Sequence, residues 1–489
     1  AFLAGGLWRT GRNALRETIC SVGIDIGTST TQLVFSRLTM ENRSAGSMIP
    51  RIEIVGKEIV YRSPIYFTPL CEEDRIDAGR LKEILKKEYA QAEIRSEDVK
   101  TGAVIITGET ARMENAEEVL RAVSDMAGDF VVSTAGPDLE SVLSAKGAGT
   151  ERLSRETGMV TANLDIGGGT SNIAVFERGE LSGCACLDIG GRLIRIKDSR
   201  IESISPRLMK LLEHYRMNIR VGEMADIPEL KRLCTILASQ LAQALHKEAL
   251  SPMHEKLYTN NGSMLPQKPA VEVVTYSGGV GACIYEEEKA PFRYGDIGIL
   301  LAEAIREQPA LSSLAVYRPS ETIRATVVGA GMHTTNISGS TICCQSELLP
   351  LKNIPVLRLR EEEEENSERL AAAIRSGIKL YGTDSGKLAI ALSGKSSRTF
   401  SQIQRLAEVL MWGADDIIRR GGPLVAIVEE DIGKSLGNAL KARIHNNCSV
   451  LCVDGIHAKG GDYVDIGEPL AGGAVVPVVV KTLILNVRE

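Results

Sequence analysis

The stretch GIDIGTSTTQLVF, residues 23–35, returns in altered form as NLDIGGGTSNIAV at residues 163–175. The aligned pairs are Asp25 with Asp165, Ile26 with Ile166, Gly27 with Gly167, Thr30 with Thr170, Thr31 with Ser171, and Gln32 with Asn172. Each copy has an apolar run, a turn of Gly, Ser and Thr, and a second apolar run, which predicts a β-hairpin. The copies lie one domain length apart, which indicates two homologous lobes rather than a short-period solenoid.

The turns of both hairpins carry residue types that suit a polyphosphate. Glycine lets the backbone turn tightly and approach a ligand, and successive N–H groups in such a turn can donate to phosphate oxygens. Hydroxyl groups add donors without adding charge. The predicted phosphate-binding residues are Gly27, Thr28, Ser29, Thr30 and Thr31 in the first hairpin, and Gly167, Gly168, Gly169 and Thr170 in the second.

Asp25 and Asp165 stand at the start of the two turns. A carboxylate beside a phosphate is repelled unless a cation lies between them, so both aspartates are predicted to hold Mg²⁺ through its retained waters. The alternative interpretation is that both aspartates are ordinary acidic residues at hairpin turns, without a bound ion. A single copy of the motif would favour this alternative. Two aligned copies favour an ATP-binding cleft between the lobes.

A third glycine-rich element follows the apolar strand predicted at residues 271–274. Glycine after a strand lets a flat base lie against bare backbone, and the start of the next helix favours negative charge. The predicted adenosine-binding residues are Ser277, Gly278, Gly279, Val280 and Gly281. A fourth run, residues 325–331, predicts a strand entering a helix of small residues, with Gly329 inside it. Residues 137–149 predict a helix with proline near its start and glycine at its end.

This set of elements, in this order, resembles the superfamily of actin, sugar kinases and heat-shock chaperones over about residues 21–345. The resemblance implies an α/β fold of two duplicated actin-like ATPase lobes, each ribonuclease H-like, with a cleft between them. It implies ATP hydrolysis, in which Asp25 and Asp165 coordinate the magnesium shell and Glu140 orients the attacking water. It also places Gly329 in a helix that connects the lobes at the nucleotide.

A narrower resemblance covers nearly the whole chain. Segments 21–38, 133–149, 164–176, 327–342 and 461–481 look like the reactivating proteins of ethanolamine ammonia-lyase. The resemblance implies an ATPase chaperone of ethanolamine utilisation with ethanolamine ammonia-lyase as its partner. Such a protein opens the lyase so that damaged cobalamin leaves and intact adenosylcobalamin enters. It also implies association with a bacterial microcompartment, and the lack of an apolar run of about 20 residues predicts a cytoplasmic protein.

Composition and charge narrow the function classes. A formal charge of −6 argues against a chain whose main task is binding nucleic acid or an anionic membrane. The ten cysteines and six histidines show no spacing typical of zinc ligands, and the cysteines are expected to be free. Asp454 precedes His457 by three residues, which breaks the Asp-x-His-x-x-Gly run of cobalamin-carrying domains. Cobalamin is therefore expected to belong to the partner enzyme.

The rest of the chain predicts a third, α/β domain. Short apolar runs at 388–392, 424–428 and 450–453 alternate with helical stretches near 401–418 and 433–443. The predicted division is an N-terminal tail at 1–20, lobes at 21–160 and 161–345, an acidic linker at 346–368, and a C-terminal domain at 369–489. The run Ser393-Gly394-Lys395-Ser396 resembles the end of a P-loop, but Ala389 stands where that motif requires glycine.

Three other functions remain open at this stage. A sugar or carboxylate kinase would need a substrate pocket, for which Glu109, Arg112 and Asp188 are candidates. A filament-forming protein would use the same ATPase for self-assembly. A reactivase of a related enzyme such as diol dehydratase would differ only in its partner, since one fold serves many functions.

Overall fold

The computed structural model describes most of the chain. The described residues are 16–27, 30–42, 52–72, 75–106, 115, 119, 123, 137–259, 264–286, 290–333, 335–338, 342–344, 348–381, 387–444, 448–460, 462–470, 473 and 475–482. Four predicted site residues, Thr28, Ser29, Glu109 and Arg112, lie outside them.

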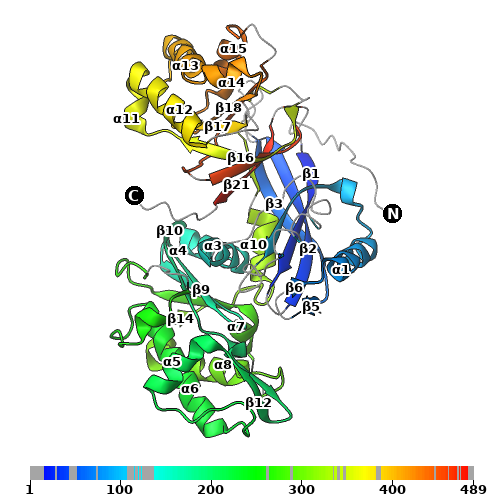
Figure 1. The fold of residues 1–489 in the computed structure, drawn as a ribbon, viewed down its shortest axis with the longest axis vertical. Coiled ribbons are helices and arrows are strands. Elements are labelled where there is room, and N and C mark those ends of the chain that lie inside the picture. Colours follow the sequence, from blue (N-terminus) through cyan, green and yellow to red (C-terminus); the bar gives the residue numbers. More distant parts are fainter. Residues whose placement is uncertain are drawn as a thin grey trace.

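The first lobe is built on one mixed sheet (Figure 1). Its strands follow the order β3-β2-β1-β7, with β4 also paired to β2. β1, β2 and β3 are antiparallel, whereas β7 runs parallel to β1. The elements are β1 Arg16–Ile26, β2 Thr30–Asn42, β3 Ile52–Arg62, β4 Tyr66–Phe67, β5 Leu70–Glu72, β6 Arg75–Ile76, α1 Ala78–Gln91 and β7 Val99–Ile106.

The second lobe repeats this arrangement. Its sheet has the order β10-β9-β8-β13-β14, in which three antiparallel strands are followed by parallel neighbours. The strands are β8 Val160–Ile166, β9 Ser171–Glu177, β10 Glu180–Leu187, β11 Ile194–Lys197, β12 Arg200–Ile204, β13 Val273–Ser277 and β14 Ala315–Val316. The helices are α4 Thr150–Thr157, α5 Pro206–His214, α6 Ile227–Ala244, α7 Gly278–Ile284, α8 Gly298–Glu307 and α9 Pro309–Ser312. The shared strand order confirms the predicted duplication.

Two helices connect the lobes and cross between them: α3 Pro137–Ala148 and α10 Ala325–His333. α3 precedes the second sheet and packs on β8, β9 and β10, whereas α10 follows that sheet and packs on β1 and β2 of the first. Figure 1 shows both helices side by side at the centre of the molecule. The predicted strand at the start of 325–331 is wrong, because α10 begins at Ala325.

Glycine allows the two helices to touch through their backbones. A Cβ on Gly147 would lie 1.8 Å from the Ala325 carbonyl oxygen, and one on Gly329 would lie 1.9 Å from that of Leu143. Gly23 of β1 is also held close to α10, since its Cβ would lie 2.3 Å from the Val327 oxygen. No other residue fits these places without moving a helix.

The C-terminal part forms a seven-stranded sheet with the order β15-β21-β20-β16-β17-β18-β19, in which β16 to β19 are parallel. The strands are β15 Thr335–Ile337, β16 Leu351–Arg358, β17 Leu388–Leu392, β18 Leu424–Val428, β19 Val450–Asp454, β20 Asp462–Ile466 and β21 Pro477–Thr482. The helices are α11 Glu361–Glu364, α12 Ser367–Tyr381, α13 Phe400–Gly413, α14 Asp415–Arg419 and α15 Gly433–Lys441. The predicted α/β pattern is confirmed.

Two segments predicted to be a linker and a tail contain parts of strands and helices. The segment taken as an acidic linker, 346–368, contains β16 in the middle of the sheet and the helix α11. The acidic run indicated exposure to solvent, and a surface helix is as exposed as a linker. Ile354 and Val356, in the strand before the acidic run, are buried. The predicted tail, 1–20, overlaps β1, which begins at Arg16 because it pairs with β2 as far as Glu41.

The third domain is joined to the first lobe. β15 follows α10 directly and pairs with β21. Val479 of β21 packs with Ala103 and Ile105 of the first lobe and with Leu143 of α3. A movement of α10 therefore reaches the C-terminal sheet through a short length of chain.

Gly329→Ala tests the helix crossing. Alanine favours a helix by up to about 1 kcal/mol over glycine. Here the added methyl would overlap the Leu143 carbonyl, so we expect the free energy of unfolding to fall by about 3 kcal/mol. The measurement is urea unfolding followed by circular dichroism. Gly279→Ala is the matched control, because its Cβ would enter open space on α7. Equal stability of the two variants would contradict the close contact.

Candidate functional site

The two hairpins have the same geometry. Gly27 N–H donates to the Thr30 carbonyl at 2.9 Å, and Gly167 N–H donates to the Thr170 carbonyl at 3.0 Å. Asp25 pairs across the strands with Gln32, and Asp165 pairs with Asn172, as the alignment of the two copies predicts. Cross-strand partners lie on one face of a sheet, so each aspartate has an amide beside it.

Asp165 is buried and held from two directions. Its side chain is 7% exposed, its Oδ1 accepts from the Ser277 hydroxyl at 2.6 Å, and its Oδ2 accepts from the Thr326 hydroxyl at 3.4 Å. Burial raises the pKa of this carboxyl to about 6, and the two hydroxyl donors oppose the rise. A cation bound beside this carboxyl would favour its charged form.

A row of buried polar side chains orients Ser277. The Thr275 hydroxyl donates to Asn163 Oδ1 at 2.8 Å, and Asn163 Nδ2 donates to the Ser277 oxygen at 2.9 Å. The Ser277 hydroxyl is thereby directed at Asp165. Ser277 was predicted to touch the nucleotide, but in the structure it positions the carboxylate.

The hairpins that carry the two aspartates both contact α10 or the residues just before it. Thr326, which donates to Asp165, is in its first turn. On the other lobe Gln32, the partner of Asp25, donates from Nε2 to the Ile323 carbonyl at 3.3 Å. Asp25 is itself 8% exposed. The hairpins of both lobes therefore contact α10 or the residues just before it, through Asp165 on one side and through Gln32 on the other.

The oxygens beside the aspartates fit a hydrated Mg²⁺. Gln32 Oε1 and Asn172 Oδ1 are buried and accept no hydrogen bond from the described residues. They occupy matching positions in the two hairpins and face the same side as the carboxylates. Mg²⁺ prefers oxygen ligands and keeps several waters, which can donate to such amide oxygens. Asp25 and Asp165 are thus suited to hold the ion through its water shell.

The glycine-rich loop after β13 lies against the second hairpin. Gly278 has φ +81°, and its Cβ would lie 2.4 Å from the Ile166 carbonyl oxygen. Gly279 is exposed beside open space, which leaves its backbone accessible to a ligand. Val280, also predicted to bind the nucleotide, is 5% exposed and packs in the core of the second lobe. Gly281 lies close to the backbone of Tyr276.

Some of the other predicted residues are accessible to a ligand, and others are buried and support the turns. Gly167, Gly168, Gly169 and Thr170 are partly exposed at the second turn, as are Gly27 and Thr30 at the first. Thr31 is buried, and its hydroxyl lies 3.1 Å from that of Thr68, which donates to the Gly27 carbonyl. Gly329 faces Leu143 in the helix crossing, which gives it a packing role, and its contact with the nucleotide stays a prediction.

Glu140 is in the first turn of α3, the helix that packs on β8, β9 and β10. Burial raises the pKa of the Cys186 thiol to about 12, and the charge of Glu140 adds to that rise. Cys186 is paired with Asn172, two residues from the Thr170 turn. Glu140 therefore lies on the hairpin side of the second sheet, and its role with water stays a prediction.

The sequence prediction missed Arg192 and Phe67. Arg192 N–H donates to the Gly168 carbonyl at 2.6 Å, and its guanidinium is 3.5 Å from Asp296. The same guanidinium lies over the Phe67 ring of the other lobe, 5.9 Å from the centroid, and Phe67 is 76% exposed. The signal was a second DIGG run, residues 188–191, just before Arg192.

Polar contacts also join the lobes along the segment before α10. Arg62 pairs with Glu321 at 2.5 Å, and Arg324 donates to the Ser63 carbonyl at 2.9 Å. Asp188, a candidate for a kinase pocket, instead accepts from Arg207 at 2.6 Å and Thr259 at 2.8 Å. Its contacts are those of a structural carboxylate.

Other features of the described residues lie apart from the predicted site. A pocket between β9 and the end of α6, lined by Val175, Leu245 and Pro266 among others, contains none of the predicted residues. In the described ranges no group of three or more His, Cys, Asp and Glu residues could hold a metal ion. None of the helices described is both long and apolar enough to span a bilayer.

Comparisons with known proteins cover nearly the whole chain. The family model described as ethanolamine utilisation protein EutA matches residues 17–486. The ethanolamine ammonia-lyase reactivase EutA of Salmonella typhimurium is 38% identical over 469 residues, 95% of this chain and 98% of the relative. Its Escherichia coli counterpart is 37% identical over 473 residues, with the same coverage. A solved Ppx/GppA family member from Aquifex aeolicus is 15% identical, covers 64% of this chain and 97% of its own, and has a TM-score of 0.39.

Asp165→Asn should stabilise the chain in the absence of nucleotide and Mg²⁺. The folded-state pKa, about 6, lies above the ordinary value of 3.8, so burial of the charge costs stability above pH 6. That cost is lost as the pH falls from 7 to 4. We expect the variant to gain about 2 kcal/mol at pH 7.5 and to show a flatter pH profile. Urea unfolding with a chelator measures both. An unchanged or lower stability at pH 7.5 would contradict the assigned burial cost.

Proposed function

The chain belongs to the ethanolamine utilisation protein EutA family, and from this premise we propose that it is an ATP-dependent reactivase of ethanolamine ammonia-lyase. The observation that supports the ATPase part is that the duplicated hairpins carrying Asp25 and Asp165 both contact α10 or the residues just before it. One carboxylate could serve structure alone. Two, each beside an amide oxygen, suit a magnesium-bound polyphosphate between the lobes.

The chain's own residues divide the work of hydrolysis. Backbone N–H groups of the two turns bind phosphate oxygens, and Asp25 and Asp165 hold the waters of the ion. Bound Mg²⁺ neutralises charge on the phosphoryl group during transfer. Glu140, from the first turn of α3, orients the attacking water. Gly279 presents bare backbone to the adenosine part.

Nucleotide binding is coupled to the rest of the molecule through α10. Its start contacts Asp165 of the second lobe, and its end is capped by Lys57 of the first, whose Nζ donates to the Met332 carbonyl at 2.6 Å. A change in the distance between the lobes must therefore move α10 or break one of these contacts. β15, which follows α10, would carry the movement to the C-terminal sheet.

Release of a tightly held cofactor requires two states of the reactivase. Work on the lyase comes only from a difference in affinity between those states. We propose that ATP and ADP select different lobe separations, and that the C-terminal domain, joined to the first lobe, presents a different surface to the lyase in each. The damaged cobalamin leaves while the lyase is held open.

The direct test uses ethanolamine ammonia-lyase blocked with cyanocobalamin. Activity should return when this protein, ATP, Mg²⁺ and adenosylcobalamin are added together, and not when ATP is omitted. Three parallel assays test the alternatives. Blocked diol dehydratase tests a reactivase of that enzyme, pelleting with ATP tests a filament-forming protein, and metabolite analysis tests a kinase. Return of lyase activity without the protein, or phosphorylation of a metabolite at the rate of ATP turnover, would refute the proposal.

Asp25→Asn and Asp165→Asn should each remove most ATP hydrolysis. Either change removes one carboxylate from the magnesium shell, which we expect to lower kcat by about 100-fold or more. Phosphate release at saturating Mg²⁺ is the measurement, and lyase reactivation should fall in parallel. Asp198→Asn, on an exposed turn, is the matched control. Near-normal turnover in both site variants would refute the assignment.

Glu140→Gln should slow hydrolysis and leave ATP affinity nearly unchanged. A group that orients water acts mainly in the transition state, so kcat should fall by roughly 10²-fold while Kd stays within about twofold. Stopped-flow hydrolysis and equilibrium binding of a fluorescent ATP analogue separate the two quantities. If affinity falls as much as turnover, Glu140 belongs to binding or packing.

A further inference from the structure

A turn of the C-terminal domain presents hydrogen-bond donors at the carboxyl end of β17. It comprises Ser393, Gly394 and Lys395. Gly394 has φ +76°, and a Cβ there would lie 2.8 Å from Val428 Cγ1, so the turn depends on glycine. The carboxyl ends of adjacent parallel strands are the usual place for ligands in open α/β sheets. Ala389, where a P-loop would have glycine, lies inside β17 and is buried, so this turn is not a P-loop.

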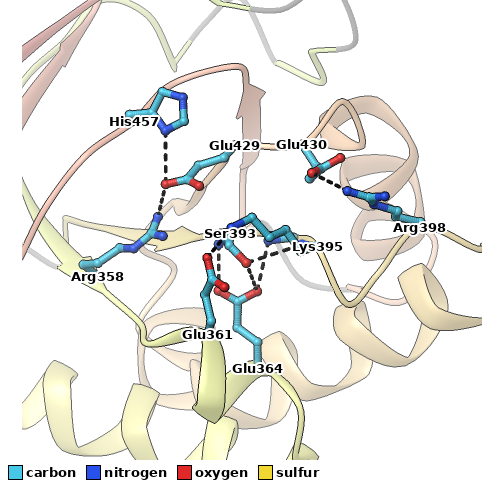
Figure 2. Close-up of polar contacts among 10 residues, drawn as sticks. Arg358, Glu361, Glu364, Ser393, Lys395, Arg398, Glu429, Glu430 and His457 are labelled. Carbon is cyan, nitrogen blue, oxygen red and sulfur yellow. Dashed lines mark hydrogen bonds and ion pairs between the residues drawn. The ribbon is translucent and has the colours of Figure 1, made fainter. Parts of the chain in front are cut away.

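An internal carboxylate occupies these donors (Figure 2). The N–H groups of Ser393 and Gly394 donate to the two oxygens of Glu364 at 2.6 and 3.0 Å. The Ser393 hydroxyl donates to the same side chain at 3.0 Å. Successive backbone N–H groups of this kind form a concave site for an oxyanion. Glu364 therefore stands in the position of an anionic ligand.

A cation beside the turn is neutralised by the same helix. Lys395 Nζ lies 2.6 Å from Glu361, and both side chains are 55% exposed. Around them, Arg398 pairs with Glu430 at 2.8 Å, while Glu429 pairs with Arg358 at 2.8 Å and with His457 at 3.2 Å. Figure 2 shows these groups over the ends of the parallel strands. Glu361 and Glu364 are the acids that reach the turn from α11.

α11 is attached by polar contacts and not by apolar packing. It has four residues, Glu361 to Glu364, and none of them is buried. Leu359 before it and Leu370 after it are buried, so both ends are anchored while the helix itself lies on the surface. Such a segment can leave the turn without exposing a hydrophobic core, because few apolar contacts hold it in place.

We propose that Ser393, Gly394 and Lys395 form a second anion site, which takes the phosphate group of a small molecule, and that α11 covers it as an internal competitor. The turn supplies two N–H groups, a hydroxyl and an ammonium, which two carboxylates now share. One phosphate dianion carries the charge of both carboxylates and has enough oxygens for all four donors. The site lies in the C-terminal domain and does not depend on the ATP cleft.

Hydrogen exchange followed by mass spectrometry locates binding on the full chain. Inorganic phosphate is titrated at millimolar concentrations against chloride of equal ionic strength. We expect faster exchange at residues 361–366, which are displaced, and slower exchange at 393–396, which are covered. The Asp165→Asn variant should respond in the same way, which separates this site from the cleft. A second arm uses AMP, and tighter binding than phosphate identifies a nucleotide as the source of the phosphate group.

Substitutions in α11 and in the turn give opposite effects. E361Q/E364Q removes the competing charges and should lower the apparent Kd for phosphate about tenfold. Adding K395A to that variant should raise the Kd at least as much. E362Q is the matched control, since no described contact joins Glu362 to the turn, and it should bind like the wild type. Circular dichroism verifies folding. The proposal is overturned if E361Q/E364Q shows no phosphate-dependent exchange at 393–396, or if K395A leaves that response intact.

Discussion

Two helices that touch through bare backbone set the distance between the lobes. At the crossing of α3 and α10, a Cβ on Gly147 or Gly329 would overlap a carbonyl oxygen of the opposite helix. Each helix also packs on the sheet of a different lobe. Any larger residue would separate the helices, and with them the two hairpins. The geometry of the aspartates is therefore a consequence of this contact.

Close approach of the helices also explains the polar interior around them. The sheet faces that α3 and α10 cover carry small polar residues, such as Ser21, which donates to the Gly331 carbonyl at 2.5 Å, and Asn163, which contacts Ser277. Buried hydroxyl and amide groups are tolerated because they bond one another. Asp165 also accepts two of these hydrogen bonds, yet burial still raises its pKa to about 6. A carboxylate kept at such a cost is typical of a binding site.

The third domain is connected to the same pair of helices and to the first lobe. β15, which follows α10 in the chain, pairs with β21 of its sheet, and β21 packs against the first lobe. A partner bound to this domain would therefore be coupled to the position of α10 by packing and covalent connection. The turn at Ser393 to Lys395, covered by Glu361 and Glu364, lies on the parallel strands β16 to β19 beyond this contact.

The sequence alone determined the duplication, the hairpins, the aspartates at their turns and the α/β character of the third domain. These features depend on residues adjacent in the chain, whose pattern is visible without contacts. It could not show that Ser277 positions Asp165, that Gly329 serves packing, that Arg192 reaches Phe67, or that the acidic run folds back onto a turn beyond α12. Those facts depend on residues that are distant in sequence. Only the packing of the sheets and helices brings such side chains together, because local propensity fixes the conformation of a segment but not its neighbours.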